Sequence, residues 1–326
     1  EKDGYHAIPR SSLKGVWYQL RAGVVVYTHA VRQEFNPVLV GRRVLKVLTW
    51  HGFPIKKIGF DDSYSKNDSI LRDRYRRVFF GYLSDRPDLV LACGELDKGC
   101  YMTAFDVLES NIVITGYPRN DALYVGERSP SDDGDFRRVI YMPTLRGLHG
   151  SLFPLLVESD FDYHKFNKLM IDNNAKMYVT THPAQDLSQA DIDFINGCSH
   201  IVVKATASDI YQNLACNDVL ITDYSGAYID FLLLDKPVVM AAIDLDEYMS
   251  LDRELYYNYP DICPSDPCKD WPQVFNELER CLKGEFDKQR LARLKSNFHK
   301  YSDGFSSRRS YEAIKSYQKS NLKDLH

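Results

Sequence analysis

Short apolar segments alternate with stretches of helical spacing along the whole chain. Four of them lie in each half, at 24–27, 44–49, 89–92, 112–115, 139–141, 177–180, 219–221 and 238–243. Strands that alternate with helices form right-handed parallel sheets. The pattern therefore predicts an α/β fold with two parallel-sheet domains in tandem, whose ligand edges face each other across a cleft.

Polar clusters follow the apolar segments directly. Thr144 and Arg146 lie just past one segment of the second half, His182 follows the next, and 222–226 follow the third. In an open parallel sheet the ligand lies outside the carboxyl ends of the strands. Because Arg, His, Asp and Ser gather at these positions, the chain is predicted to hold a nucleotide- or phosphate-handling site.

The polar stretch 126–135 contains Gly and Pro, lacks periodicity, and is the clearest linker. It predicts a first domain over 1–125 and a second over 136–300. Residues 301–326 have helical spacing, and we expect this C-terminal helix to cross back onto the first domain.

The composition is that of a globular protein: 326 residues, 44% hydrophobic and 26% charged. No apolar run approaches the roughly 20 residues needed to span a bilayer. The chain opens on charged residues without an initiator Met, so we expect no signal peptide and a first domain shortened at its start. Seven scattered cysteines, of which only Cys263 and Cys268 are close, indicate reduced thiols in a cytoplasmic protein.

The net charge of −4 is unevenly distributed. Residues 42–77 and residues 283–319 each carry ten Lys/Arg against four Asp/Glu. Solvated helix faces explain any single charge, but two basic tracts on an acidic protein indicate a phosphate-rich partner or an anionic membrane surface. Nucleic acid is not an expected partner, because the overall balance is acidic and no nucleic-acid module occurs.

His51 is the first candidate for chemistry, and it lies between Trp50 and Gly52. Gly52 lets the backbone approach a ligand, Pro54 stops the strand, and a neutral imidazole accepts a proton at physiological pH. The alternative is a turn histidine bonded to the backbone. Lys56 is expected to meet either acceptor phosphates or water.

His182 repeats this arrangement in the second half, where it is held by Pro183 and can donate to a phosphate oxygen or a leaving group. Arg146 has the planar guanidinium that suits a pyrophosphate, and its alternative is an ordinary surface arginine. No Walker loop, GxGxxG, HExxH or DxD pattern stands where a strand would present it, so no metal and no other cofactor is expected.

The segment Thr222-Asp223-Tyr224-Ser225-Gly226 leads into an apolar stretch at 227–234. Free N–H groups at a helix start bind anions, and Ser225 either caps that helix or bonds a phosphate as well. Asp223 is expected to brace the loop. Asp230 lies in an apolar run and needs a partner.

Several motifs occur together: Trp-His-Gly-Phe-Pro-Ile-Lys-Lys-Ile-Gly-Phe-Asp (50–61), Gly-Tyr-Pro-Arg-Asn-Asp (116–121), Met-Pro-Thr-Leu-Arg (142–146), Thr-His-Pro (181–183), Leu-Ile-Thr-Asp-Tyr-Ser-Gly (220–226) with Asp230, Leu-Asp-Lys-Pro (234–237) and Asp-Gly-Phe-Ser-Ser-Arg (303–308). In this order they resemble the CDP-glycerol glycerophosphotransferase family, the teichoic-acid primases and polymerases and related capsule enzymes. The resemblance extends from about Ser11 to Arg309.

The resemblance implies a GT-B-like fold with an acceptor-side first domain and a CDP-donor-binding second domain. It implies metal-independent transfer of a polyol phosphate, glycerol phosphate first, from a CDP-activated donor to a hydroxyl of a lipid-linked glycan or growing polymer, with release of CMP. It also implies a cytoplasmic protein held peripherally on the inner face of a bacterial cell membrane.

The same resemblance assigns roles to residues. His51 matches the proposed general base, and His182 matches the donor-side histidine at the pyrophosphate. The substrate-binding residues carried over are Gly52, Lys56, Asn120, Thr144, Arg146, Thr222, Asp223, Ser225, Gly226, Asp230 and Arg253.

Two positions depart from the family pattern: Phe53 replaces a threonine and Gly226 replaces a serine. Both changes remove a hydroxyl and bear on which polyol phosphate is moved. Two other functions stay open: a GT-B sugar transferase or sugar-nucleotide epimerase that uses the same cleft, and a non-catalytic domain that binds lipid-linked polymer.

Overall fold

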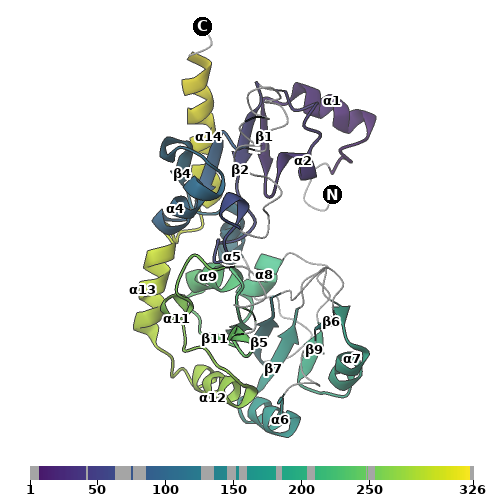
Figure 1. Ribbon diagram of the computed structural model, residues 1–326. Coiled ribbons are helices and arrows are strands. Elements are labelled where there is room, and N and C mark those ends of the chain that lie inside the picture. Colours follow the sequence, from purple (N-terminus) through teal and green to yellow (C-terminus); the bar gives the residue numbers. More distant parts are fainter. Residues whose placement is uncertain are drawn as a thin grey trace. The chain divides into compact units, whose positions relative to one another are not determined.

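The chain forms two compact units, Glu1–Pro118 together with Phe305–His326, and Arg119–Gly304 (Figure 1). The computed structural model describes residues 7–41, 43–62, 75, 86–125, 136–144, 152–153, 160–180, 186–203, 210–246, 248 and 254–323. The predicted linker at 126–135 lies outside them.

The first unit contains a four-stranded parallel sheet in the order β1-β2-β3-β4. The strands are β1 (Val24–Tyr27), β2 (Leu45–Leu48), β3 (Leu89–Ala92) and β4 (Ile112–Ile114). All four residues of β3 are buried, as expected for a parallel strand whose two faces are both covered. The register pairs Tyr27 with Leu48, so β1 and β2 end side by side.

The described residues of this unit include the helices α1 (Leu13–Arg21), α2 (Val31–Glu34), α4 (Glu95–Ala104) and α14 (Ser306–Lys323). They also include the 3₁₀ turns η1 (Gly59–Asp61) and η3 (Glu109–Asn111). The C-terminal helix α14 packs Ile314 and Tyr317 against the sheet core.

The start of α14 is fixed to the end of β4 by a close backbone approach. Gly116 has φ +74°, and a Cβ there would lie 2.4 Å from the hydroxyl of Ser306, so only glycine fits. Arg309 Nε donates to the Thr115 carbonyl at 2.9 Å, and the Ser310 hydroxyl donates to Thr115 Oγ1 at 3.1 Å. The Asp-Gly-Phe-Ser-Ser-Arg motif therefore begins the helix that covers this sheet.

The second unit contains a five-stranded parallel sheet in the order β11-β10-β5-β7-β9. The strands are β5 (Arg137–Met142), β7 (Ala175–Val179), β9 (Ile201–Val203), β10 (Val219–Thr222) and β11 (Val238–Met240). The chain builds outward from β5 to β9 and then crosses to the other side of β5. The strand order thus reverses between β5 and β10, and such a switch point is where open α/β sheets bind ligands.

Among its described residues, the second unit has the helices α5 (Ala122–Val125), α6 (Tyr163–Asp172), α7 (Gln189–Asn196), α8 (Ile210–Ala215), α9 (Ala227–Phe231), α11 (Tyr259–Ile262), α12 (Trp271–Leu282) and α13 (Lys288–Phe298). Short elements are η4 (Pro118–Asp121), η5 (Leu232–Leu234) and the parallel pair of β6 (Leu152–Phe153) with β8 (Asp186–Leu187). Trp271 and Phe275 of α12 and Phe166 of α6 fill the core over β5 and β7. The prediction of two parallel α/β domains is confirmed.

Candidate functional site

His51 lies three residues past the end of β2, at the carboxyl edge of the first sheet. Its side chain is exposed, and its Nδ1 lies 3.2 Å from the carbonyl oxygen of Thr28, which follows β1. A carbonyl oxygen only accepts hydrogen bonds, so Nδ1 carries the hydrogen and the lone pair of the neutral ring is on Nε2. The sequence analysis gave a backbone hydrogen bond of His51 as the alternative to a catalytic role. In the structure this bond sets the tautomer that a general base needs, because it leaves no hydrogen on Nε2.

His29 faces His51 from the neighbouring strand end. Their ring centroids are 4.0 Å apart and the ring planes differ by 7°. Glu34 Oε1 accepts the backbone N–H groups of Thr28 and His29, each at 2.7 Å. Glu34 therefore fixes the loop that carries both His29 and the carbonyl bonded to His51. The sequence analysis selected neither His29 nor Glu34; the only signal was that His29 also follows a strand.

Trp50 turns the chain between β2 and His51. Its φ is +54°, in the left-handed region, which costs a non-glycine residue about 1–3 kcal/mol and tends to occur at functional sites. The centre of its ring lies 4.1 Å from that of His51 and 5.2 Å from that of Phe105, which follows α4 directly. The turn thus gives His51 an aromatic contact on Trp50 in addition to its stack on His29.

Gly52 faces open space, because no described atom lies within 4 Å of the position that a Cβ would take. Phe53, one of the two departures from the family pattern, is 4% exposed and belongs to the core of the first unit. Its phenyl group therefore fills the interior of the first unit. Lys56 is partly exposed, four residues past Gly52.

Thr144 and Asp223 meet at the switch point of the second sheet. Asp223 is 2% exposed, and its carboxylate accepts the Thr144 N–H at 3.0 Å, the Thr144 hydroxyl, and the Tyr224 N–H at 2.7 Å. The Thr222 hydroxyl donates to the Met142 carbonyl at 2.6 Å. The ends of β5 and β10 are thus tied together, and Asp223 braces this edge as the sequence analysis predicts.

Ser225 and Gly226 lie at the start of α9 and are both partly exposed. Ser225 Oγ accepts the N–H of Ala227, the first residue of α9, at 3.2 Å, while the N-cap position itself is Gly226, which has no capping side chain. Gly226 has φ −61°, an ordinary helical value, so the serine that the family pattern carries there needs no change of backbone. The binding of phosphate by either residue stays a prediction.

Asp230 is 1% exposed and lies in a network of polar side chains. Its carboxylate accepts Arg119 Nε at 3.2 Å, Asn120 Nδ2 at 2.9 Å and the Tyr211 hydroxyl at 3.1 Å. Burial, followed by the charge of Asp230, raises the pKa of Tyr211 above its ordinary value. The partner that Asp230 requires is therefore Arg119 with Asn120, and Arg119 was not selected from the sequence.

Three predicted site residues, Arg146, His182 and Arg253, lie outside the described residues. Their roles remain predictions from the sequence.

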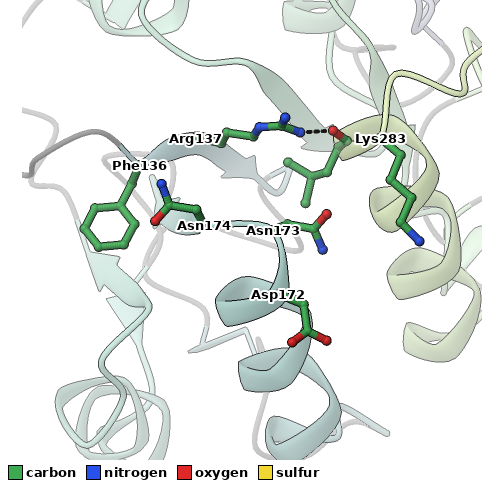
Figure 2. Close-up of a pocket in the computed structure, with 7 residues that line it drawn as sticks. Phe136, Arg137, Asp172, Asn173, Asn174 and Lys283 are labelled. Atoms are coloured by element: carbon green, nitrogen blue, oxygen red, sulfur yellow. Dashed lines mark hydrogen bonds between the residues drawn. The ribbon is translucent and has the colours of Figure 1, made fainter.

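A cavity of about 580 Å³ opens at the opposite edge of the second sheet (Figure 2). It is lined by Phe136, Arg137, Asp172, Asn173, Asn174, Leu282 and Lys283. Arg137 is the first residue of β5 and donates to the Leu282 carbonyl. Because the cavity is at the amino end of β5, it is separate from the polar cluster at the carboxyl end.

The seven cysteines are all free thiols. Burial raises the pKa of Cys263, Cys268 and Cys281 to about 12, so these thiols stay protonated and unreactive at neutral pH.

Within the described ranges, no group of three or more His, Cys, Asp or Glu is placed to hold a metal ion. No helix described here has the length and apolarity needed to cross a membrane.

Two parallel α/β units with polar residues at the carboxyl edges of their strands define a two-domain protein of the GT-B-like class. The structure of the wall teichoic acid polymerase TagF has this fold: it matches 99% of this chain and 80% of its own chain, with a TM-score of 0.74 at 20% identity. A family model, CDP-glycerol:poly(glycerophosphate) glycerophosphotransferase, matches residues 1–316. The chain belongs to this family.

Two curated relatives show how the similarity is distributed. The teichoic acid glycerol-phosphate primase of Bacillus subtilis (strain 168) is 25% identical over 94% of this chain and 76% of its own length. The teichoic acid ribitol-phosphate polymerase TarL of Staphylococcus aureus (strain NCTC 8325 / PS 47) is 24% identical over 85% of this chain. The match spans 49% of TarL, so TarL is much longer than the matched region.

Proposed function

We propose that this protein transfers a polyol phosphate, glycerol phosphate first, from a CDP-activated donor to a hydroxyl of a lipid-linked glycan or a growing teichoic-acid or capsule polymer, with release of CMP. Membership of the glycerophosphotransferase family over residues 1–316 supports the reaction class. Relatives named for glycerol phosphate and for ribitol phosphate support a polyol phosphate as the transferred group. The observation that carries the assignment is the Nδ1 contact of His51 with the Thr28 carbonyl.

His51 acts as general base in this proposal. The acceptor oxygen attacks the β-phosphorus of the donor, the bond from that phosphorus to the bridging oxygen breaks, and its electrons leave with CMP. The hydroxyl proton moves to Nε2 of His51 and later to solvent. A positioned histidine base contributes typically about 10²–10⁴-fold.

The second unit holds the donor. Thr144, Thr222, Ser225 and Gly226 lie at the switch point, which supports their assignment to the donor phosphates, and Asp223 acts there by bracing the loop. Since phosphoryl transfer depends mainly on positioning and on neutralising charge, we assign Arg146, His182 and Arg253 to the charge of the pyrophosphate. Asp230 acts through Arg119, whose guanidinium it binds, and Asn120 donates to the same carboxylate.

We place the protein in the cytoplasm, peripherally on the inner face of the cell membrane, because the proposed acceptor is lipid-linked. Of the basic tract 42–77, residues 43–62 and 75 are described. The tract 283–319 is divided between the two units, and Lys283, Arg290, Lys295 and Arg308 pair with carboxylates. These pairs reduce the charge that this tract can offer to anionic lipid.

A donor comparison tests the proposed reaction. Purified protein is incubated with a synthetic lipid-linked acceptor and, in turn, CDP-glycerol, CDP-ribitol and UDP-sugars, and the released nucleotide and the product mass are measured. The proposal predicts CMP and an acceptor enlarged by whole polyol phosphate units. Release of UDP with sugar transfer, or no turnover with any donor, contradicts it.

A further inference from the structure

One face of helix α4 (Figure 1) is made by Asp97, Tyr101 and the C-cap residue Phe105. A spacing of four residues places such side chains above one another along a helix. Asp97 and Tyr101 are fully buried, whereas Phe105 is partly exposed. The face therefore runs from the interior of the first unit to its surface.

The buried end of this face is fixed to the ends of two strands. The Asp97 carboxylate accepts the N–H groups of Cys93 and Gly94, directly past β3, at 2.7 and 2.8 Å. It also accepts the hydroxyl of Tyr117, three residues past β4, at 2.6 Å. The hydroxyl oxygens of Tyr101 and Tyr117 are 2.7 Å apart. Because these groups are buried, their bonds fix the rotation of α4 about its axis.

The exposed end of the face contacts the segment 50–61, which carries His51. The centre of the Phe105 ring lies 5.7 Å from that of Tyr101 and 5.2 Å from that of Trp50, with an angle of 61° between the Phe105 and Trp50 planes. The centre of the Trp50 ring lies in turn 4.1 Å from that of His51. A line of ring contacts therefore joins the buried network to the proposed base.

The last turn of α4 also holds the far end of the segment 50–61. The Thr103 hydroxyl donates to the Asp61 carboxylate at 2.6 Å. Gly59 has φ +56°, and a Cβ there would lie 2.2 Å from the Ala104 carbonyl oxygen, so only glycine fits. The segment is therefore attached to α4 at both of its ends.

We propose that Phe105 is a positioning residue for the transfer: it holds the Trp50 ring, and through that ring it holds His51 with Nε2 toward the acceptor hydroxyl. The bond from Nδ1 of His51 to the Thr28 carbonyl restrains one edge of the imidazole, whereas contact with the Trp50 ring restrains its tilt. This inference rests on the proposed function of His51 as general base.

Kinetics test the role with Phe105→Leu, which removes the ring, and Phe105→Tyr, which retains it. The matched control is Phe286→Leu, since Phe286 is also partly exposed and packs against the core of the second unit. With CDP-glycerol and a lipid-linked acceptor, we expect kcat to fall about 3–10-fold in Phe105→Leu, with unchanged donor affinity by calorimetry. Phe105→Tyr should restore most of kcat, and Phe286→Leu should equal wild type.

A double-variant cycle tests whether the effect passes through Trp50. Trp50→Leu should lower kcat by itself, and adding Phe105→Leu to that variant should cause little further loss, because both changes break the same contact. An equal effect of Phe105→Leu with and without the Trp50 ring would contradict this path.

A measurement without substrate separates the inference from the proposed reaction. In protein labelled with ¹³C at histidine Cε1, the His51 signal is identified by its loss in His51→Ala, and the ring current of Trp50 shifts it. We expect this signal to move in Phe105→Leu and to stay in place in Phe105→Tyr and Phe286→Leu. The signal of His164 on α6 should stay in place in every variant.

Thermal unfolding checks that each variant is folded, and Phe105→Met, which fills the space without a ring, replaces Phe105→Leu if the latter unfolds. An unmoved His51 signal in the variant without the ring overturns the inference, as does an equal loss of kcat in Phe105→Leu and Phe105→Tyr. A moved signal in a protein that transfers nothing sustains the positioning of His51 and contradicts the proposed transfer.

Discussion

The rings of His29 and His51 stack 4.0 Å apart, with planes that differ by 7°. The register of the sheet produces this contact, because Tyr27 pairs with Leu48 and the two histidines follow these paired residues within three positions. The orientation of the proposed base therefore depends on the neighbouring strand end.

Replacement of His29 tests how much its stack on the His51 ring contributes to catalysis, apart from the hydrogen bond of His51 to the Thr28 carbonyl. Aromatic pairs contribute about 0.5–1.5 kcal/mol, so His29→Ala should lower kcat about 3–10-fold, while the affinity for a CDP donor stays unchanged. His29→Phe retains the stacked ring and should recover most of the loss. Steady-state kinetics measure kcat, and calorimetry measures the affinity for the CDP donor. An equal decrease of kcat in His29→Ala and His29→Phe would show that the stack does not position His51.

The buried carboxylate of Asp230 should dominate local stability. Removing one partner of a buried ion pair costs about 3–5 kcal/mol, so Asp230→Ala, which leaves Arg119 without this partner, should lower the free energy of unfolding by that amount. Asp172→Ala is the control, since its pair with Lys168 is exposed and contributes little to stability. Urea unfolding measures both, and similar losses would contradict the assignment.

The raised pKa of Asp97 predicts that the free energy of unfolding depends on pH. Its carboxylate is buried, which raises its pKa from 3.8 to about 6 although it accepts the N–H groups of Cys93 and Gly94. Between about pH 6 and pH 4 the folded state therefore binds the proton more tightly than the unfolded state, and this group adds stability as pH falls.

The expected gain relative to Asp97→Asn is up to about 1.4 kcal/mol per pH unit, measured by urea unfolding from pH 7 to pH 4.5. Asp162→Asn is the control and should show no such trend over this range, because the bond from the Lys165 N–H lowers the pKa of Asp162 below its usual value of 3.8. A difference between wild type and Asp97→Asn that stays constant over this range would refute the prediction.

The donor-side assignments predict a different kinetic signature. His182→Ala and Arg146→Ala should each weaken CDP-donor binding or slow CMP release, because both are assigned to the pyrophosphate. Since these cations are proposed to neutralise the phosphates, activity should persist in EDTA. Complete loss in EDTA with recovery on adding Mg²⁺ would contradict this part of the account.

The strands could be predicted because each is a continuous apolar segment that parallel sheets bury on both faces. Residues 24–27 form β1 as predicted, whereas the segment 177–180 lies two residues later than the start of β7 at Ala175. The residues after the strands could be selected as site candidates because ligands bind outside the carboxyl ends of parallel strands. The positions of Thr144 and Asp223 in the site follow from strand order.

What the sequence did not reveal are contacts between distant parts of the chain. Arg119 and Asp230 are 111 residues apart and pair only because η4 and α9 pack together in the second unit. The stack of His29 on His51 depends on the register of β1 and β2. Periodicity along the chain does not encode these relationships.

The central claim is that His51 accepts the proton in a transfer from a CDP-polyol. The most direct measurement follows CMP and the mass of a lipid-linked acceptor with CDP-glycerol and three proteins: wild type, His51→Ala, and His164→Ala, whose histidine is exposed on α6. We predict equal amounts of CMP and added glycerol phosphate for wild type and His164→Ala. For His51→Ala we predict turnover at least about 10²-fold lower with unchanged donor affinity by calorimetry. Near-normal turnover of His51→Ala, or loss of donor binding in that variant, would contradict the claim.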